Sequence, residues 1–248
     1  TLWADVVRKA PHHARGHYNL AHALETDGDY AKAIGHYRRA VELNPNDATS
    51  HNNLANLLAE VEGDLTSAIR HYRRALEIDP RYASAYDNLG KALARTGDVA
   101  GAIVECRKAL EVRPDYAPAH VHLATLLAAG RPEEALAHAR HAVEMAPRSA
   151  EAHNALASLV AAARPDDALR HYQTALEIEP GCADAHFNMA NLLVGRGRVA
   201  EAIAHLREAL RARPDWELAA NNLRVLTGAV RESPRTSAPD ASSRETPR

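Results

Sequence analysis

Prolines recur through most of the chain at an almost constant interval. They stand at positions 11, 45, 80, 114, 147, 180 and 214, so successive prolines are 34, 35, 34, 33, 33 and 34 residues apart. Each closes a similar phrase, such as HYRRAVELNP from His36 and HYRRALEIDP from His71. A fixed period of this length indicates a stack of repeated units, each of which buries its apolar face against its neighbours.

The repeat at residues 14–45 predicts two helices. Its first half carries packing residues at the helical spacing i, i+3, i+4, i+7, namely His17, Leu20, Ala21 and Leu24. Its second half, YAKAIGHYRRAVEL, has a similar stripe and stops at Asn44, because proline disfavours helix at the residue before it. We therefore expect an all-α chain, a right-handed α-solenoid of tandem antiparallel helix pairs without strands.

The turns between the two helices have their own signals. Glycines are expected to end the first helices in a left-handed conformation, at Gly28, Gly63, Gly97, Gly130 and Gly197. Asp29, Asp64 and Asp98 follow three of them and are expected to cap the second helices. Two turns, GRPEEAL and ARPDDAL, have no capping aspartate before the second helix. Their prolines, Pro132 and Pro165, suit the first position of that helix.

Charge and hydropathy exclude several classes of partner. The formal net charge is −2 and the pI is near 6.7, which argues against nucleic acid. No apolar run reaches the ~18 residues of a membrane span, so we expect no membrane contact by this segment itself. Because the chain opens with Thr1, we read it as a fragment. Its localisation stays open between the cytoplasm and a soluble tail of a bacterial membrane protein.

The pattern resembles the tetratricopeptide repeat (TPR). Three copies of the signature are His17-Leu20-Ala21-Leu24-Ala33-Tyr37-Ala40-Pro45, His51-Leu54-Ala55-Leu58-Ala68-Tyr72-Ala75-Pro80 and Tyr86-Leu89-Gly90-Leu93-Ala102-Cys106-Ala109-Pro114. Three further copies end at Pro147, Pro180 and Pro214. The resemblance implies six tandem repeats over residues 12–214.

The two ends are expected to differ from the repeats. Residues 1–11 resemble the second helix of a truncated repeat, and their apolar side chains could support self-association. Residues 215–230 predict a capping helix, with Leu218, Leu223 and Leu226 available to cover the last repeat. Residues 231–248 are rich in Ser, Pro, Thr and charge, and we expect them to be disordered.

The resemblance also implies a binding surface. In TPR proteins the first helices line a concave groove, and the residue before the conserved leucine points into it. This position holds Asn19, Asn53, Asn88, His122, Ala155, Asn188 and Asn222. The row resembles the asparagine ladder of the O-linked N-acetylglucosamine transferase superhelix, whose amides hold a peptide backbone. We assign to this groove Asn19, Asn53, Asn88, His122, Asn188, Asn222, Arg15, Asn56, Lys91 and Asn191.

A narrower alternative is the carboxylate clamp of chaperone-binding TPR domains. Arg15, Asn19 and Asn53 match three of its five positions, but Ser84 and Asn88 stand where two basic residues are needed. The ladder therefore remains the leading interpretation.

Metal and catalytic chemistry are not expected. Cys106 replaces the tyrosine of other repeats and should be a small buried side chain. Most of the fifteen histidines recur at two equivalent positions, which favours packing over converging ligands. No phosphate loop or nucleophile–base arrangement is visible, so we expect no enzyme, no metal and no cofactor.

Two functions remain. The first is a non-catalytic scaffold that binds an extended peptide or protein segment through the ladder. The alternative is the substrate-recruiting TPR region of a larger glycosyltransferase, because the opening TLWADVVRKAPHHARGHYNLAHAL resembles the start of TPR tails in bacterial membrane glycosyltransferase-like proteins.

Overall fold

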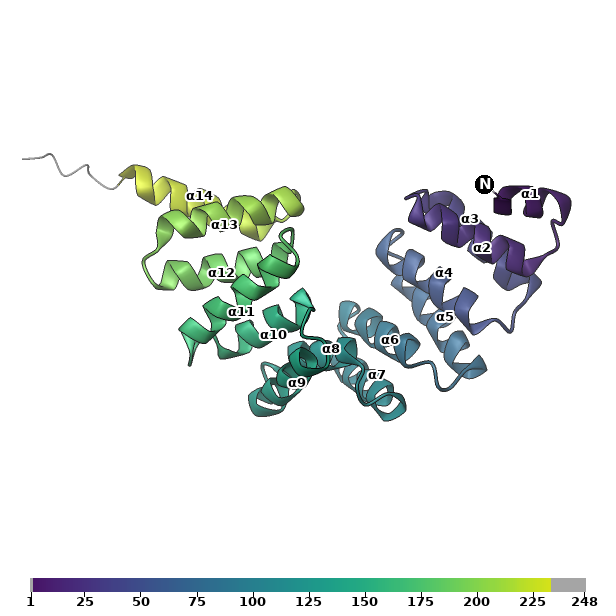
Figure 1. Ribbon diagram of the computed structural model, residues 1–248, viewed down its shortest axis with the longest axis horizontal. Coiled ribbons are helices and arrows are strands. Elements are labelled where there is room, and N and C mark those ends of the chain that lie inside the picture. Colours follow the sequence, from purple (N-terminus) through teal and green to yellow (C-terminus); the bar gives the residue numbers. More distant parts are fainter. Residues whose placement is uncertain (1, 233–248) are drawn as a thin grey trace, which may run out of the picture. The chain divides into compact units, whose positions relative to one another are not determined.

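The computed structural model describes residues 2–232, which form fourteen α-helices and no strand (Figure 1). The helices are α1 (Leu2–Lys9), α2 (Ala14–Thr26), α3 (Tyr30–Leu43), α4 (Ala48–Glu60), α5 (Leu65–Ile78), α6 (Ala83–Arg95), α7 (Val99–Val112), α8 (Ala117–Leu127), α9 (Pro132–Met145), α10 (Ala150–Val160), α11 (Pro165–Ile178), α12 (Ala183–Gly195), α13 (Val199–Ala212) and α14 (Glu217–Glu232). The all-α solenoid predicted from the period is confirmed.

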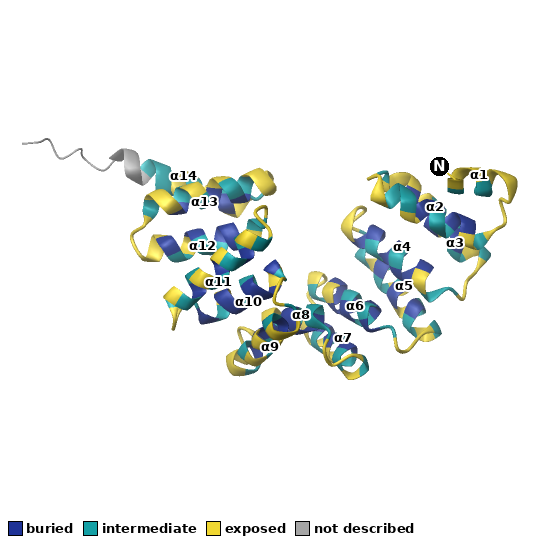
Figure 2. Ribbon diagram, viewed as in Figure 1, coloured by how far each residue is buried: buried dark blue, intermediate teal, exposed yellow. Residues whose placement is uncertain are grey.

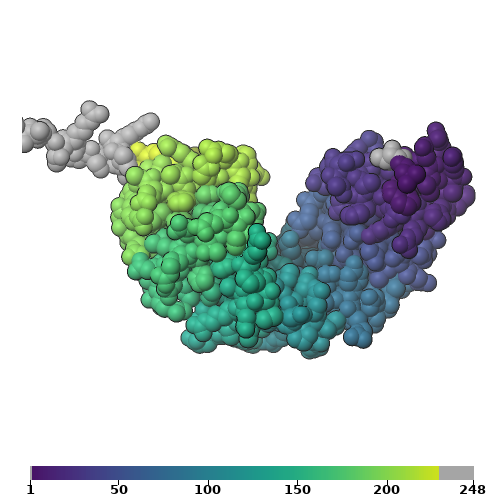
Figure 3. Space-filling model, viewed as in Figure 1, coloured from purple at the N-terminus to yellow at the C-terminus, as the bar shows by residue number. Residues whose placement is uncertain are grey.

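The described residues form two compact units, of which the first ends at Val160 and the second begins at Ala161. In the first, α2 packs on α3, α4 on α5, α6 on α7 and α8 on α9, and each pair also contacts the next element along the chain. In the second, α11 packs on α12, α12 on α13 and α13 on α14. Figure 3 shows this order within each unit as a continuous change of colour. The division falls between α10 and α11, the two helices of the repeat that ends at Pro180.

The caps form largely as the sequence predicts. The carboxylates of Asp29, Asp64 and Asp98 accept hydrogen bonds from backbone N–H groups three residues on, at the starts of α3, α5 and α7. Gly28, Gly63, Gly97 and Gly197 have positive φ, as expected. Gly130 does not, so this part of the prediction is wrong. The reason is that α8 has 11 residues where α2, α4 and α6 have 13, so its turn is built differently.

Small side chains fill the helix interfaces. Figure 2 shows that buried and exposed residues alternate along the helices. Buried alanines recur at the same positions in successive repeats, and Tyr37, Tyr172 and Leu54 are among the largest fully buried side chains. Alanine lets helices approach closely, so the core is thin and every repeat depends on its neighbour. Cys106 is completely buried, as its position in the repeat predicts.

A histidine pair joins the two helices in several repeats. His17 and His36, His51 and His71, His120 and His138, and His186 and His205 bring their Nδ1 atoms within 2.8–2.9 Å. In each pair the buried first-helix ring also bonds through Nε2 to the carbonyl of the proline that precedes its helix. The first-helix histidines therefore use both ring nitrogens within the repeat, and their second-helix partners use Nδ1.

The last helix covers the end of the second unit. Leu223 and Leu226 pack, with Trp216, against the cluster formed by α12 and α13. Leu218 does not, because it is 55% exposed, so its predicted capping role is wrong. Helix α14 also continues through Glu232, two residues into the segment expected to be disordered. The rest of that segment, residues 233–248, lies outside the described residues.

The first helix is the least supported element of the described chain. α1 packs on α2 but buries none of its residues, and Leu2 is largely exposed. The two helices approach closely at Gly16, where an added Cβ would lie 3.3 Å from Val6. Self-association through this helix stays a prediction.

Candidate functional site

Asn88 of α6 is held by two side chains of α4. Its Nδ2 group donates to Oδ1 of Asn52 at 3.2 Å and to Oδ1 of Asn56 at 3.1 Å. Asn56 also accepts a hydrogen bond of 2.7 Å from the hydroxyl of Tyr72. Both N–H groups of Asn88 are thus used, which fixes the orientation of the amide and leaves Oδ1 as an acceptor.

Asn53 is tied into the preceding repeat. Its Nδ2 group donates to the hydroxyls of Tyr18 and Tyr37 at 3.3 and 3.5 Å, and its Oδ1 accepts from Asn52 at 3.2 Å. The Tyr37 hydroxyl in turn donates to Glu25, and burial is the main cause that raises the pKa of Tyr37. Asn53 therefore helps hold repeats together, and it is half-buried rather than freely exposed.

Asn56, Asn88 and Lys91 line one depression of about 250 Å3 between α4 and α6. Its other lining residues are Ala59, Glu60, Tyr72, Ala92 and Arg95. Glu60 Oε1 lies 3.3 Å from Lys91 Nζ and 3.1 Å from Arg95 Nη1. Two cations share one carboxylate, so this polar depression carries a net positive charge.

Arg15 and Asn19 lie outside that depression. Arg15 is exposed and lines a separate depression of about 330 Å3 with Tyr18, Asp47 and neighbouring residues. Asn19 is half-buried, and within residues 2–232 its side chain makes no hydrogen bond. The structure therefore does not join all the predicted groove residues of this unit into one site.

The second unit repeats the amide contact seen at Asn88. The Nδ2 group of Asn222 donates to Oδ1 of Asn191 at 3.2 Å. Asn222 and Asn191 occupy the same repeat positions as Asn88 and Asn56, one before and two after the conserved apolar residue of their helices. They line a depression of about 260 Å3 with Val194, Leu206, Val225 and Leu226. Asn188 is half-buried on α12.

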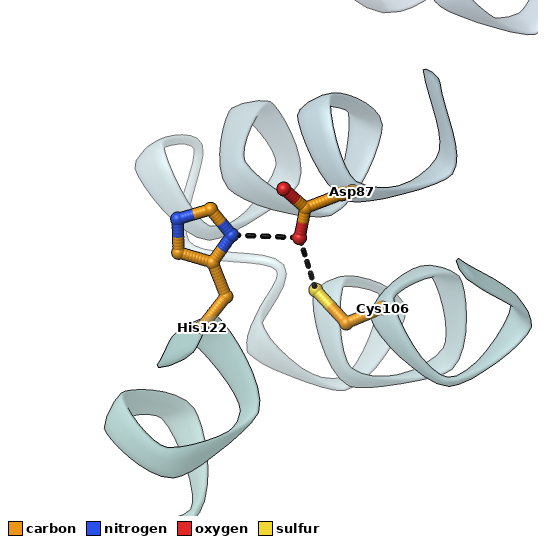
Figure 4. A group of neighbouring side chains, drawn as sticks. All are labelled: Asp87, Cys106 and His122. Atoms are coloured by element: carbon orange, nitrogen blue, oxygen red, sulfur yellow. Dashed lines mark hydrogen bonds and ion pairs between the residues drawn. The ribbon is translucent and has the colours of Figure 1, made fainter. Parts of the chain in front are cut away.

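His122 departs from the asparagine row in its contacts. Its Nδ1 lies 2.7 Å from Oδ1 of Asp87, a buried carboxylate on α6. The thiol of Cys106 on α7 donates to the same oxygen at 3.9 Å (Figure 4). Burial raises the pKa of this thiol to about 12, and the Asp87 charge adds to the effect. His122 is therefore part of a three-residue cluster rather than of the amide row.

Sequence reasoning missed several residues of these sites. Glu60 and Tyr72 line the first depression and Asp87 anchors His122, but none of the three was assigned to the groove. The sequence could have indicated Asp87. Three other repeats have an asparagine at the same position, at residues 52, 154 and 221, so the carboxylate is a departure from the pattern.

The chain matches models of one repeat family along most of its described length. Models described as tetratricopeptide repeat match residues 93–159 and 159–225, and related models match residues 14–47, 36–70 and 62–97. Within residues 2–232, no helix combines the length and apolar character that membrane crossing requires.

Two mammalian relatives are similar over short segments. Protein O-mannosyl-transferase TMTC1 of Mus musculus is 39% identical over 61 residues, and its counterpart of Homo sapiens is 42% identical over 57 residues. These segments cover 25% and 23% of this chain but only 6% of each relative.

Solved structures share the fold. A chain of the APC/C hetero-tetramer Cut9–Hcn1 superposes with a TM-score of 0.80 at 17% identity, over 90% of this chain and 45% of that one. The thermophilic TPR protein TTC0263 of Thermus thermophilus superposes with a TM-score of 0.62 at 27% identity, over 73% of this chain and 99% of that one. This chain therefore spans less than half the length of the first and nearly all of the second.

Proposed function

Because the chain belongs to the tetratricopeptide repeat family, we propose that it binds an extended peptide or protein segment along the first helices of its repeats. The family's fold is a protein-interaction scaffold and is typically non-catalytic. The single observation that carries the proposal is the recurring amide pair, Asn88 with Asn56 and Asn222 with Asn191, each beside a depression.

These amide pairs suit recognition of a peptide backbone. A peptide unit offers one donor and one acceptor, whatever its side chain. Asn88 keeps its Oδ1 for a peptide N–H, while Asn222 has one N–H and Oδ1 beyond its bond to Asn191. Since the amides are already oriented by their neighbours, little conformational freedom is lost when a ligand binds.

The depression beside Asn88 favours an acidic group on the ligand. Lys91, Arg95 and Glu60 are about half exposed, so their ion pairs contribute little to stability. One positive charge is left over, and it can attract a carboxylate of the bound segment. The depression beside Asn222 instead has four apolar lining residues, which suit an aliphatic side chain.

The proposal is tested by selecting random peptides on the full chain by phage display and measuring their affinities. We expect enriched peptides to carry acidic residues. Asn88→Ala and Asn222→Ala should each weaken binding of a peptide that engages that position. A lost hydrogen bond of about 0.5–1.5 kcal/mol corresponds to roughly twofold to tenfold.

Asn221→Ala is the matched control, because Asn221 neighbours Asn222 on α14, is exposed, and bonds Arg224. It should leave every affinity unchanged. The proposal fails if no peptide is enriched, or if the two variants bind all enriched peptides as wild type does while their thermal unfolding is unaltered.

The alternative is that these repeats recruit substrates for a larger glycosyltransferase. It is favoured by the similarity of a short segment to the O-mannosyl-transferase TMTC1, together with the opening residues of the chain. The coding sequence upstream of Thr1 tests it. A run of membrane helices leading into a glycosyltransferase region supports this alternative, and an upstream sequence without either contradicts it.

A further inference from the structure

Three departures from the repeat pattern meet at one point of the first unit. Cys106 replaces the buried tyrosine of other repeats, His122 replaces the ladder asparagine, and Asp87 replaces an asparagine. They belong to three successive helices, α6, α7 and α8, and their side chains point toward one another in Figure 4. The three residues hold three different positions of the repeat pattern. Their side chains meet because α6, α7 and α8 pack against one another.

The three ligand atoms have nearly the spacing that a metal ion requires. The His122 Nδ1–Asp87 Oδ1 distance is 2.7 Å, the Cys106 Sγ–Asp87 Oδ1 distance is 3.9 Å, and all three atoms lie within 4.8 Å of one another. Tetrahedral zinc with bonds of about 2.0–2.3 Å separates its ligand atoms by roughly 3.3–3.8 Å. Side-chain shifts of about 1 Å therefore suffice to place an ion between them.

The local packing makes room for the sulfur atom. A Cβ added at Gly90 would lie 2.6 Å from Cys106 Sγ, closer than atoms can approach. Five of the other repeats have alanine at the position of Gly90, at residues 21, 55, 124, 157 and 190. The repeat that has cysteine at position 106 therefore also has glycine in place of alanine at position 90. This allows α6 and α7 to approach closely where the thiol contacts Asp87.

We propose that Asp87, Cys106 and His122 bind a divalent transition-metal ion, with Zn2+ as the best match. Thiolate, imidazole and carboxylate are its usual protein ligands, whereas Mg2+ and Ca2+ prefer oxygen alone. One carboxylate and one thiolate balance the charge of the ion, which suits a buried location. Asp87 and Cys106 are buried, but the His122 side chain is 27% exposed, so a fourth position can open toward solvent beside it.

Binding has a defined proton balance. The Cys106 thiol is neutral without metal, since burial raises its pKa to about 12. Formation of the sulfur–metal bond therefore breaks the S–H bond and releases one proton to solvent. In its hydrogen bond to Asp87, Nδ1 of His122 carries the proton, because a carboxylate only accepts. When Nδ1 binds the ion, this proton moves through solvent to Nε2 of the same ring, so a neutral imidazole adds no proton to the one that the thiol releases.

Cobalt is the spectroscopic probe for this site. The full chain, reduced and stripped of metal by a chelator, is titrated with Co2+. We expect thiolate-to-cobalt charge-transfer absorption that saturates at one ion per chain and disappears when Zn2+ is added. Titration of Zn2+ calorimetrically in buffers of different ionisation enthalpy should show release of about one proton from the thiol at pH 7.

The variants assign the ligands. The described chain has two cysteines, so Cys182→Ser should keep the absorption and Cys106→Ser should abolish it. His122→Asn restores the residue found elsewhere in the row, and Asp87→Asn does the same for its position. Each should weaken Co2+ binding at least tenfold, since even groups that merely support a ligand contribute that much.

Circular dichroism and thermal unfolding identify variants that keep the fold, and His122→Asn serves if Cys106→Ser fails to fold. The proposal is overturned if wild type shows no thiolate–cobalt absorption at millimolar Co2+, or if His122→Asn binds as wild type does. The cluster is then an ion pair with a thiol donor. These outcomes are independent of peptide binding, which is measured without metal.

Discussion

Nδ1 of His51 lies 2.8 Å from Nδ1 of His71, while Nε2 of His51 lies 3.3 Å from the carbonyl oxygen of Pro45. The carbonyl can only accept, so His51 carries its proton on Nε2 and its Nδ1 must accept from His71. His51 is thus neutral with its proton on Nε2, and His71 donates from Nδ1. A proton added to His51 would place two N–H groups face to face unless His71 moved its own proton to Nε2.

This pair predicts a loss of stability in mild acid. Burial lowers the pKa of His71 from 6.5 to about 4, with further contributions from His51, Arg70 and Arg38. Burial also lowers the pKa of His51. Well above pH 6.5 His71 is unprotonated in both the folded and the unfolded chain. Between about pH 6.5 and 4 the unfolded chain binds protons that the folded chain excludes, so the free energy of unfolding falls as the pH falls. Urea unfolding at pH 7.5 and 5.0 measures this difference.

His71→Asn is the diagnostic variant, because its amide can donate in place of Nδ1–H and does not titrate. It should reduce the difference in unfolding free energy between pH 7.5 and 5.0. His22→Asn is the control, since His22 is exposed on α2, and it should behave as wild type does. An unchanged pH dependence in His71→Asn would contradict the structural account of the pair.

Gly90→Ala should destabilise the fold. The added Cβ would lie 2.6 Å from Cys106 Sγ and 3.1 Å from the carbonyl oxygen of Ala102, so α6 and α7 must separate. Overpacking of this kind costs about 1–3 kcal/mol. Gly35→Ala on α3 is the control, because nothing lies within 4 Å of its added Cβ, and it should stabilise by about 0.5–1 kcal/mol. Equal unfolding midpoints in urea for the two variants would exclude this packing argument.

The helices could be predicted because their signals are local. A cap such as Asp64 bonds a backbone group three residues away, and Pro132 acts on its own turn. Gly130 shows the limit, since α8 ends at Leu127, two residues earlier in its repeat than α2, α4 and α6 end, and its turn needs no positive φ at the glycine. Leu218 shows another, because the helical stripe of α14 was assigned without knowing which side meets α13.

The candidate sites depend on contacts between repeats, which the sequence pattern does not specify. Asn88 meets Asn52 and Asn56, residues 36 and 32 positions earlier, only because α6 packs beside α4 in one register. The period could place Asn88 in a row with Asn53. It could not show that their amides would be partly used within the protein.

Leu223→Ala should destabilise the second unit more than Leu218→Ala. Leu223 packs on the cluster that contains Leu206 and Ala219, so its truncation should cost about 1–2 kcal/mol. Leu218 lies on the same helix but is 55% exposed, and its truncation should stay within about 0.5 kcal/mol. Urea unfolding curves measure both. Similar losses would mean that α14 does not cover the end of the unit through the face assigned here.

Glu60→Gln should strengthen the binding of an acidic peptide at the depression beside Asn88. The substitution frees Lys91 and Arg95 from the carboxylate that lies 3.3 and 3.1 Å from them. Because these pairs are half exposed, stability should change by less than about 1 kcal/mol. One charge at about 4 Å in water is worth about 1 kcal/mol, so affinity should rise roughly fivefold at low ionic strength. The gain should shrink as salt is added.

Lys91→Gln is the converse variant, and it should lower the affinity for the same acidic peptide by a similar factor. The control is a peptide in which Asn and Gln replace Asp and Glu, because it keeps the side-chain shape and loses the negative charge. Its affinity should be the same for wild type, Glu60→Gln and Lys91→Gln. Fluorescence anisotropy at two salt concentrations measures all of these affinities. If Glu60→Gln and Lys91→Gln bind the acidic peptide equally at low salt, the positive charge of this depression does not select the ligand, and backbone contacts to the amides alone would have to account for binding.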